Sequence, residues 1–560
     1  MNIHKRSFMS VGIVGLVSAI SYGTAQAVTF DNEYVRGSFD STVSVGFGVR
    51  TKSPSCGLVT AGATGTGAPE GCLGPVAGLF DQGDLNYGRG DPFTTYLKGS
   101  HELLLKMPSE ITFMARATWL RDFSATQTTG ITSGTIASGV TPTPSNFDSG
   151  LTPDAREDLR FKARLLDLWV SKGFAIGDQQ ARLRVGNQVV NWGESLFQPG
   201  GINSTNAYDA MRLSQPGTQL KEAVLPAPMI SLATGLGGGF NVEAYVQSRW
   251  NETYVPPVGS YWSTTNGLGK GSGDYGYSTV EPRKTGQWGV ALRYQPRGTQ
   301  LNLGVYAMNF HDKVPQITVD QTTFTQGPWT YAEDRRLFGI SANFPVGDWA
   351  VGTELSYRPK DAVSLNPLSG CVAQNGKCWV DERRFQWHLN GLLSLTPSNA
   401  GSLLKLLGAD TATFLVEGVV IRYPKLKQDY SGSPVAAGYW GWGNETNDLS
   451  AGLNPSVPTG TKTSSGINLD FSWTYDGTLI PGWQVVPEIL YFQALSGRTP
   501  NVTAQFMKGA KSVNFVVNFI QNPASWQATV NYARFMGGQS PFDQPLRDRD
   551  FVGFNLSRNF

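Results

Sequence analysis

Large apolar and polar residues alternate with a period of two along most of the chain. The segment 467–475 reads Ile-Asn-Leu-Asp-Phe-Ser-Trp-Thr-Tyr, and the same alternation occurs in 43–49 and 385–391. Successive side chains of a β-strand point to opposite faces, so each segment has one apolar and one polar face. The pattern therefore predicts an all-β protein.

The segments that alternate in this way predict about 18 strands. We place them at 38–50, 93–107, 109–122, 162–173, 179–190, 229–235, 239–250, 286–296, 299–310, 335–345, 348–358, 383–396, 411–423, 465–475, 483–493, 511–520, 525–535 and 550–560.

The connections between these strands alternate strictly between short and long. Short connections include 173–178 and 297–298, and long ones include 51–92 and 123–161. A soluble sandwich gives no reason for this asymmetry, whereas outer-membrane barrels have short periplasmic turns opposite long external loops. We predict a transmembrane antiparallel β-barrel with long extracellular loops, short periplasmic turns and both termini in the periplasm. Two of the short connections have structure of their own, a helix at 402–407 and a Gly- and Pro-containing turn at 476–482.

The two ends of the chain carry export and assembly signals. Residues 1–27 combine a basic start, an uncharged apolar run and small residues before a cleavage site after Ala27, as in a secretory signal peptide. We predict that residues 28–560 form one barrel domain, integral to the bacterial outer membrane. The last strand ends in Phe560 and resembles the signal that the barrel-assembly machinery recognises, although Arg558 interrupts its apolar row.

The composition agrees with a barrel between lipid and water. The chain has 66 glycines, an aromatic fraction of 11% and only 16% charged residues, which suits an apolar outer face and a polar interior. Loss of residues 1–27 removes Lys5 and Arg6 from the 45 basic residues and leaves 43 of each sign. A neutral chain argues against nucleic acid as a partner, because binding to its backbone needs a basic excess.

Four cysteines occur in a chain that we expect to be exported into an oxidising compartment. They are Cys56, Cys72, Cys371 and Cys378, and four cysteines permit three pairings. We predict the local pairing of Cys56 with Cys72 and of Cys371 with Cys378. A metal site is the weaker interpretation, because the chain has no CxxC motif and few histidines.

No catalytic motif stands out in the sequence. GxSxG, HExxH and phosphate-binding loops are missing, so we predict that the protein is not an enzyme and has no cofactor or metal. One alternative stays open, a Ser–His pair assembled across neighbouring strands. Asp81, Asp84 and Asp91 could bind a cation loosely, but a solvated loop is the better interpretation.

The connection 191–228 differs from the Ser-, Thr- and Gly-rich loops around it. Its apolar residues and paired charges indicate one inward-folded loop, and a large barrel needs something to limit its bore. Asn203 is a candidate N-cap for a short helix that Pro216 would end. We predict a constriction or plug; the alternative is an ordered external lid. The candidate constriction residues are Asn203, Tyr208, Arg212, Lys221 and Glu222.

Alternation also assigns side chains to the lumen. The polar faces of the predicted strands carry Arg116, Arg182, Arg184, Arg384, Gln386, His388, Asn468 and Asp470. The arginines favour either a mild preference for anions or ion pairs across the bore.

Several segments resemble a family of Gram-negative outer-membrane proteins that carry a domain of unknown function. They are 84–87 (Asp-Leu-Asn-Tyr), 184–195, 216–228, Trp250 with 256–261, 286–289 and 549–551, and the resemblance covers essentially the whole mature chain. It implies a porin-like barrel in a setting of hydrophobic-compound metabolism. It also implies two partners, a periplasmic lipid-binding protein and an inner-membrane pump.

A barrel without catalytic motifs predicts an outer-membrane channel or transporter for small hydrophobic or amphipathic organic molecules. The alternative is a non-transporting barrel that acts as a receptor, adhesin or scaffold of a trans-envelope complex. The expected partners are outer-membrane lipid and the permeant. Aromatic residues in the external loops could offer permeants an apolar landing surface: Trp262, Tyr275, Tyr277, Tyr439, Trp440 and Trp442.

Overall fold

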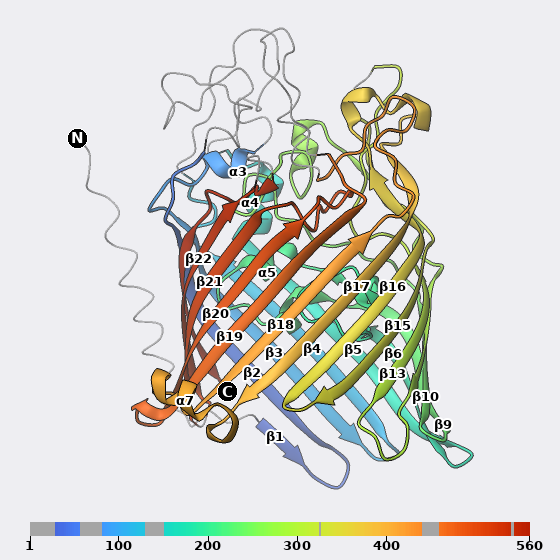
Figure 1. The fold of residues 1–560 in the computed structure, drawn as a ribbon. Helices are drawn as coiled ribbons and strands as arrows, with labels where there is room; N and C mark the ends of the chain where they lie inside the picture. The colour runs from blue at the N-terminus through green and yellow to red at the C-terminus, as the bar shows by residue number, and fades with distance from the viewer. Residues whose placement is uncertain are drawn as a thin grey trace, which may run out of the picture.

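The protein is a closed β-barrel. A computed structural model describes residues 28–55, 81–128, 150–323, 326–438, 459–522, 524–538 and 543–560. Within these residues, 18 strands pair in an antiparallel manner in chain order, and the last strand, β23 (Phe551–Asn559), pairs with β2 (Arg36–Arg50) to close the wall (Figure 1). The strands between them are β3 (Pro92–Met107), β4 (Ile111–Asp122), β5 (Phe161–Ile176), β6 (Gln179–Gln188), β9 (Ala227–Gly237), β10 (Phe240–Gln247), β12 (Gln287–Tyr294), β13 (Asn302–Phe310), β15 (Arg335–Val346), β16 (Trp349–Ser364), β17 (Trp379–Leu395), β18 (Thr411–Arg422), β19 (Thr463–Ile480), β20 (Trp483–Ser496), β21 (Ala510–Gln521) and β22 (Trp526–Gly537).

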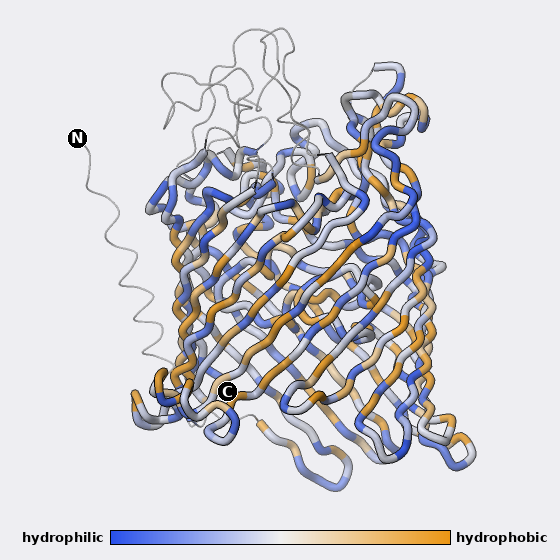
Figure 2. The backbone as a smooth tube through the Cα atoms, viewed as in Figure 1, coloured by the Kyte–Doolittle hydropathy of each residue, from blue (hydrophilic) through white to orange (hydrophobic). Residues whose placement is uncertain are grey.

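The period-two pattern separates the two faces of the wall, as predicted. In β12 the exposed side chains are Trp288, Val290 and Leu292, whereas Gln287, Gly289 and Ala291 are buried. Figure 2 shows apolar positions alternating with polar ones along the strands of the wall. Exposed large apolar side chains on the outside of a closed barrel place that face in lipid, so the strands are the membrane-spanning elements.

Each predicted strand corresponds to one strand of the barrel, but several are longer than predicted. The turn predicted at 476–482 is wrong in extent, because β19 continues to Ile480. Asp410 supports this extension, since its Oδ2 accepts a hydrogen bond from the backbone N–H of Asp476 at 2.7 Å. The chain also has a strand that was not predicted, β1 (Val28–Asp31), which pairs with the start of β2.

The C-terminal strand ends beside the beginning of β2. The backbone groups of Phe560 and Ser41 exchange two hydrogen bonds of 2.7 and 3.1 Å. The guanidinium of Arg558, which interrupts the apolar row, lies over the rings of Trp526 and Phe560 at 5.1 and 5.0 Å from their centroids. Two aromatic rings therefore cover this cation at the end of the strand.

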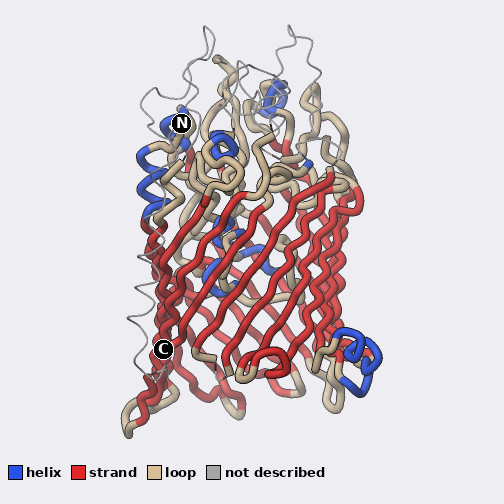
Figure 3. The backbone as a smooth tube through the Cα atoms, turned by 90° about the vertical axis from the view of Figure 1, so that its left-hand side faces the viewer, coloured by secondary structure: helices blue, strands red, loops and turns tan. Residues whose placement is uncertain are grey.

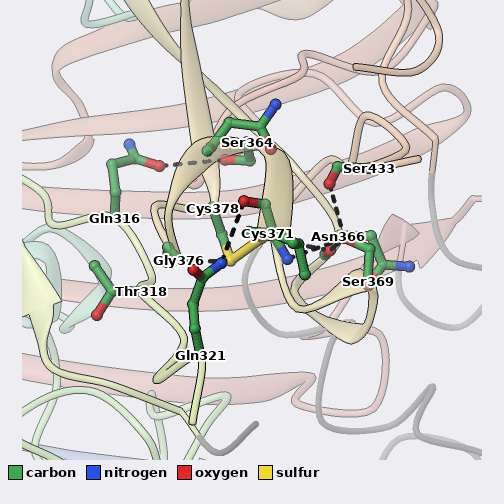
Figure 4. Close-up of a disulfide and its surroundings, with 12 residues drawn as sticks. Gln316, Thr318, Gln321, Ser364, Asn366, Ser369, Cys371, Gly376, Cys378 and Ser433 are labelled. Atoms are coloured by element: carbon green, nitrogen blue, oxygen red, sulfur yellow. Dashed lines mark hydrogen bonds between the residues drawn. A yellow bond between two sulfur atoms is a disulfide. The ribbon is translucent and has the colours of Figure 1, made fainter. Parts of the chain in front are cut away.

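The predicted pairing of Cys371 with Cys378 is confirmed. The disulfide joins two buried cysteines in an extracellular loop between β16 and β17, with Cα atoms 5.3 Å apart (Figure 4). It packs in an apolar cluster with Leu365 of the same loop and Val435 of the loop between β18 and β19. The predicted pair of Cys56 and Cys72 lies outside the described residues.

Replacing both Cys371 and Cys378 by serine should weaken this loop but leave the barrel intact. A disulfide that closes so short a loop contributes about 2–3 kcal/mol in the chain-entropy model, and the strand pairing does not depend on it. We expect faster proteolysis within 366–378 and an unchanged shift in gel migration on heating, the usual test of a folded barrel. Loss of the heat shift would contradict this prediction.

The remaining elements are short. Outside the lumen they are α3 (Gln82–Leu85), α4 (Pro153–Arg160), α7 (Pro397–Leu407), the 3-10 turns at Ser272–Tyr275, Pro367–Ser369 and Val372–Gln374, and the small strands β11 (Thr279–Val280) and β14 (Trp329–Thr330). The helix predicted at 402–407 is confirmed within α7. Among the described residues, no helix is long and apolar enough to cross a bilayer.

Candidate functional site: a segment held inside the lumen

Residues 189–226, which connect β6 to β9 and which we call the inward segment, fold into the barrel as predicted. Figure 3 shows short helices and loops enclosed by the wall, and Figure 1 labels α5 among them. The inward segment contains a 3-10 turn (Ile202–Thr205), β7 (Ala207–Tyr208), α5 (Ala210–Ser214), α6 (Leu220–Ala223) and β8 (Val224–Leu225), with β7 paired to β8. The predicted connection, 191–228, extends two residues into β9.

Two buried carboxylates of the wall bind the first half of the inward segment through its backbone. Glu417 on β18 accepts hydrogen bonds from the N–H groups of three consecutive residues, 196–198, at 2.8–3.0 Å. Glu354 on β16 accepts from the N–H groups of Glu194 and Ile202, at 2.6 and 2.9 Å. Both carboxylates are almost completely buried. Five backbone donors thus meet charged acceptors, which form stronger hydrogen bonds than neutral ones.

Neighbouring side chains on the same wall hold these carboxylates and the segment in place. His388 on β17 is fully buried, and its Nδ1 lies 3.0 Å from Oε1 of Glu417. Asn390, two residues further along β17, donates to the backbone carbonyl of Glu194. Arg358 on β16 donates to the carbonyl of Gly200 at 2.8 Å and ion-pairs with Asp361 at 2.8 Å.

The second half of the inward segment is fixed to β3. The Nζ atom of Lys98 lies 2.8 Å from Oε2 of Glu222 in a buried ion pair, and it also donates to the carbonyl of Gly217 at 2.9 Å. The hydroxyl of Tyr96 donates to the carbonyl of Pro216 at 2.9 Å. In the ring of strands, β3 and β18 are separated by six strands in the shorter direction. The inward segment is therefore attached to well-separated parts of the wall and crosses the lumen.

The five predicted constriction residues all lie on the inward segment. Asn203 is not a helix cap: Gly201 is the N-cap of its 3-10 turn, Asp209 caps α5, and the amide of Asn203 donates to Ser195 Oγ at 2.8 Å. Tyr208 is in β7, Arg212 is buried in α5, and Glu222 is the buried partner of Lys98. Lys221 is half exposed, with its Nζ 3.6 Å from Oε2 of Glu102.

The predicted lumen residues divide into two groups. Arg384 and His388 are buried and not exposed to an open path. His388 contacts the anchor Glu417, and Arg384 donates to Gln386, whose amide donates to the carbonyl of Pro199 in the inward segment at 3.1 Å. Arg116 ion-pairs with Glu102 and Asp167, at 2.9 and 2.6 Å, across neighbouring strands. Two further arginines of this group lie on β6: Arg184 stacks on Trp169 and Arg182 is exposed.

Part of the lumen wall next to the anchor Glu417 combines aliphatic and polar side chains. Register places Leu415, Asp470, Leu490 and Asn514 side by side on β18 to β21, all on the lumen face. Asp470 adjoins Glu488 on the next strand, and Glu488 accepts a hydrogen bond from Asn518 at 3.3 Å. This wall offers both apolar contacts and hydrogen-bonding groups to anything in the lumen.

A Ser–His pair of the kind that the sequence left open does form, but on the lipid-facing side. Ser41 Oγ lies 3.0 Å from Nδ1 of His101, and the indole N–H of Trp119 donates to Nε2 of His101 at 3.0 Å. An Nε2 atom that accepts this bond leaves the proton of the neutral ring on Nδ1. His101 then donates to Ser41 and cannot remove its proton, so the pair lacks the arrangement of an activated nucleophile.

Two expectations for the external loops are wrong for particular residues. Trp262 offers no landing surface, because it is buried in an aromatic cluster with Tyr87, Phe93, Tyr261 and Phe551. Tyr439, Trp440 and Trp442 lie outside the described residues. Asp81 and Asp84 are neither solvated nor arranged for a cation: Arg549 and Arg50 occupy them, at 2.6 and 2.7 Å.

A closed barrel with a lipid-facing outer surface and a segment folded into its lumen defines an integral outer-membrane protein of the porin-like class. The chain belongs to the family described as protein of unknown function DUF1302, whose model matches residues 8–560. No curated protein matches this chain.

Several solved structures are similar to this chain, among them that of the Pseudomonas aeruginosa outer membrane protein OpdK. One is Pseudomonas aeruginosa OpdK crystallised with vanillate, with 11% identity, coverage of 94% of this chain and 98% of that chain, and a TM-score of 0.40. Another is Acinetobacter baumannii OccAB1, with 10% identity, coverage of 96% and 98%, and a TM-score of 0.44.

Proposed function

We propose that the protein is an outer-membrane channel for small organic molecules, narrowed by the inward segment. The main support is that buried charged groups on separate parts of the wall bind this segment, through Glu354 and Glu417 on one part and Lys98 on another. A surface lid needs no such attachment inside the lumen. A segment fixed across the bore limits what passes and leaves the rest of the lumen available.

The composition of the wall beside the inward segment supports the proposal that the permeants are amphipathic. Leu415 and Leu490 flank Asp470 on the lumen face, so a permeant could place an apolar part and a polar part on the same surface. Partly exposed leucines are not expected on the lumen face of a channel that passes only ions and water. Catalysis is not part of this proposal, since Ser41 and His101 lack the required tautomer. The periplasmic lipid-binding protein and the inner-membrane pump remain predictions from the family resemblance.

Single-channel conductance in planar bilayers tests this function. Gln188 and Ala227 are paired neighbours on β6 and β9, so residues 190–225 can be replaced by a four-residue Gly-Ser linker without stretching the wall. We expect a small conductance for the wild type and a larger one for the variant. A silent wild type with a conducting variant would indicate a plug that must move during transport. If both folded proteins fail to conduct, the channel is excluded and the receptor or scaffold function becomes the better explanation.

A further inference from the structure

The helix α7, at the periplasmic end, leaves leucines exposed where a water-soluble surface would not. Its regular part, 401–407, has Leu404 buried against the barrel, whereas Leu406 is 83% exposed and Leu403 is 38% exposed. Residues three and four apart share a helix face, so Leu403, Leu406 and Leu407 form one apolar stripe. Lys405 is exposed and points away from this stripe.

The same edge of the barrel exposes a second apolar element. Beside the turn that joins β19 to β20, the last two residues of β19, Leu479 and Ile480, are 58% and 40% exposed. Asp410, just after α7, binds this end of β19 through the N–H of Asp476 at 2.7 Å and the hydroxyl of Thr478 at 3.4 Å. The helix and the turn are thus connected, and together they extend the apolar surface.

Two contacts fix α7 on the outside of the wall. Tyr475 belongs to the lipid-facing row of β19, and its hydroxyl donates to the carbonyl of Leu407 at 2.7 Å. Trp473, in the same row, donates its indole N–H to the Tyr475 hydroxyl at 3.2 Å. Figures 1 and 3 both place α7 beside the barrel, at the end where the chain terminates. Tyrosine and tryptophan at such a position mark the membrane–water interface.

We propose that α7 and the β19–β20 turn form an interfacial foot that lies in the inner leaflet of the outer membrane, with phospholipid as its partner. The apolar stripe is continuous with the lipid-facing surface of β19 through Tyr475. An amphipathic helix parallel to the membrane buries its apolar face at the boundary between head groups and acyl chains and keeps its cation in water. The positions of Leu406 and Lys405 fit this arrangement, so lipid, and not a periplasmic protein, covers the leucines.

Spin labels test the foot in a background in which all four cysteines are serine. One label replaces Leu406 (Leu406→Cys), a second replaces Leu403 (Leu403→Cys), and the matched control replaces Lys405 (Lys405→Cys). The protein is reconstituted in phosphatidylethanolamine–phosphatidylglycerol vesicles. Collisions with oxygen, which concentrates in lipid, are compared with collisions with a water-soluble nickel complex. We expect the oxygen-to-nickel ratio at 403 and 406 to exceed that at 405 by about threefold or more.

Two results would overturn the inference. Equal ratios at 405 and 406 in vesicles, with the heat-dependent gel shift intact, would place α7 in water. The nickel complex could also reach position 406 in vesicles but not in native outer-membrane fragments. That result would mean that a protein, and not lipid, covers the leucines. If one leucine variant fails to fold, the other carries the same comparison.

Discussion

Replacing Glu354 and Glu417 together by glutamine should roughly double the mean single-channel conductance, or more, and make it noisy. Glutamine keeps the shape of each side chain but replaces one acceptor oxygen by an NH₂ group. Because the five N–H groups of 196–198, Glu194 and Ile202 are shared between both oxygens of each carboxylate, at least one of them at each position would then face a donor. A buried donor without an acceptor costs about 1–3 kcal/mol, so several such losses should release the segment from β16 and β18. The measurement is single-channel recording of refolded wild type and double variant under the same salt.

A matched control is Glu488→Gln. This carboxyl group also faces the lumen, but its hydrogen-bond partner is Asn518 on the wall, so the inward segment should stay in place. The double variant alone should therefore show the enlarged, fluctuating conductance. An unchanged, quiet conductance in a double variant with normal heat-shifted migration would mean that Arg358, Asn390 and the Lys98 ion pair are sufficient to hold the segment.

The barrel was predictable because the membrane imposes a strict pattern on each strand. A strand with one face in lipid must alternate, and Ile467 to Tyr475 does so without exception. The ends of strands were less predictable, because they extend beyond the lipid. Outside the lipid neither face of a strand must be apolar, so apolar and polar residues no longer need to alternate. Asp476 illustrates this, since a contact with Asp410 on a neighbouring turn decides that β19 continues there.

The inward segment was predictable from its composition, but its anchors were not. Glu354 and Glu417 are charged residues on the lumen faces of β16 and β18, between Thr353 and Leu355 and between Val416 and Gly418. Such positions are common in a polar lumen, and nothing in the sequence separates an anchor from a lining residue. The difference arises from contacts with a segment more than 150 positions away in the chain. The N-cap of α5 was misplaced at Asn203 for a related reason, because several capping residues compete within a few positions and tertiary contacts choose among them.

The extracellular loops are joined by a buried ionic cluster that makes a second strong prediction. Arg549 binds both oxygens of Asp81 at 2.6 Å and donates to the carbonyl of Tyr261 at 2.5 Å. Arg50 binds Asp84 at 2.7 Å and reaches Asp548 at 3.3 Å. Two arginines thus face three carboxyl groups, and the cluster connects the loops around 81–91, 257–263 and 543–550. Tyr87 and Tyr261 are titratable side chains that also pack against it: Arg50 donates to the carbonyl of Tyr87 at 2.7 Å, and its guanidinium lies 5.8 Å from the ring centroid of Tyr261.

The packing of these loops should become less stable as the pH rises, because the buried carboxyl groups of the cluster lose their protons. Burial raises the pKa of Asp81 to about 6, with Arg549 opposing the rise and Asp84 adding to it. Burial, and then the adjoining Asp84, raise the pKa of Asp548 well above its ordinary value. A carboxyl group whose pKa is higher in the packed loops than in the opened loops stabilises packing most at low pH. That contribution is fully present below about pH 4 and is lost as the pH rises through about 6 and beyond.

Arg549→Met should open these loops at every pH, and the wild type should show a smaller opening between pH 5 and pH 8. Removing one partner of a buried ion pair typically costs about 3–5 kcal/mol, because the remaining charges stay buried without compensation. The measurement is the rate of cleavage within 81–91 and 543–550 by a protease active over the whole pH range.

Arg534→Met is the matched control: Arg534 is exposed and its Nε lies 3.8 Å from Asp550, so its loss should change little. Asp548→Asn, which resembles the protonated acid, should flatten the pH dependence, and a wild-type cleavage rate that falls from pH 5 to pH 8 would refute the assigned direction.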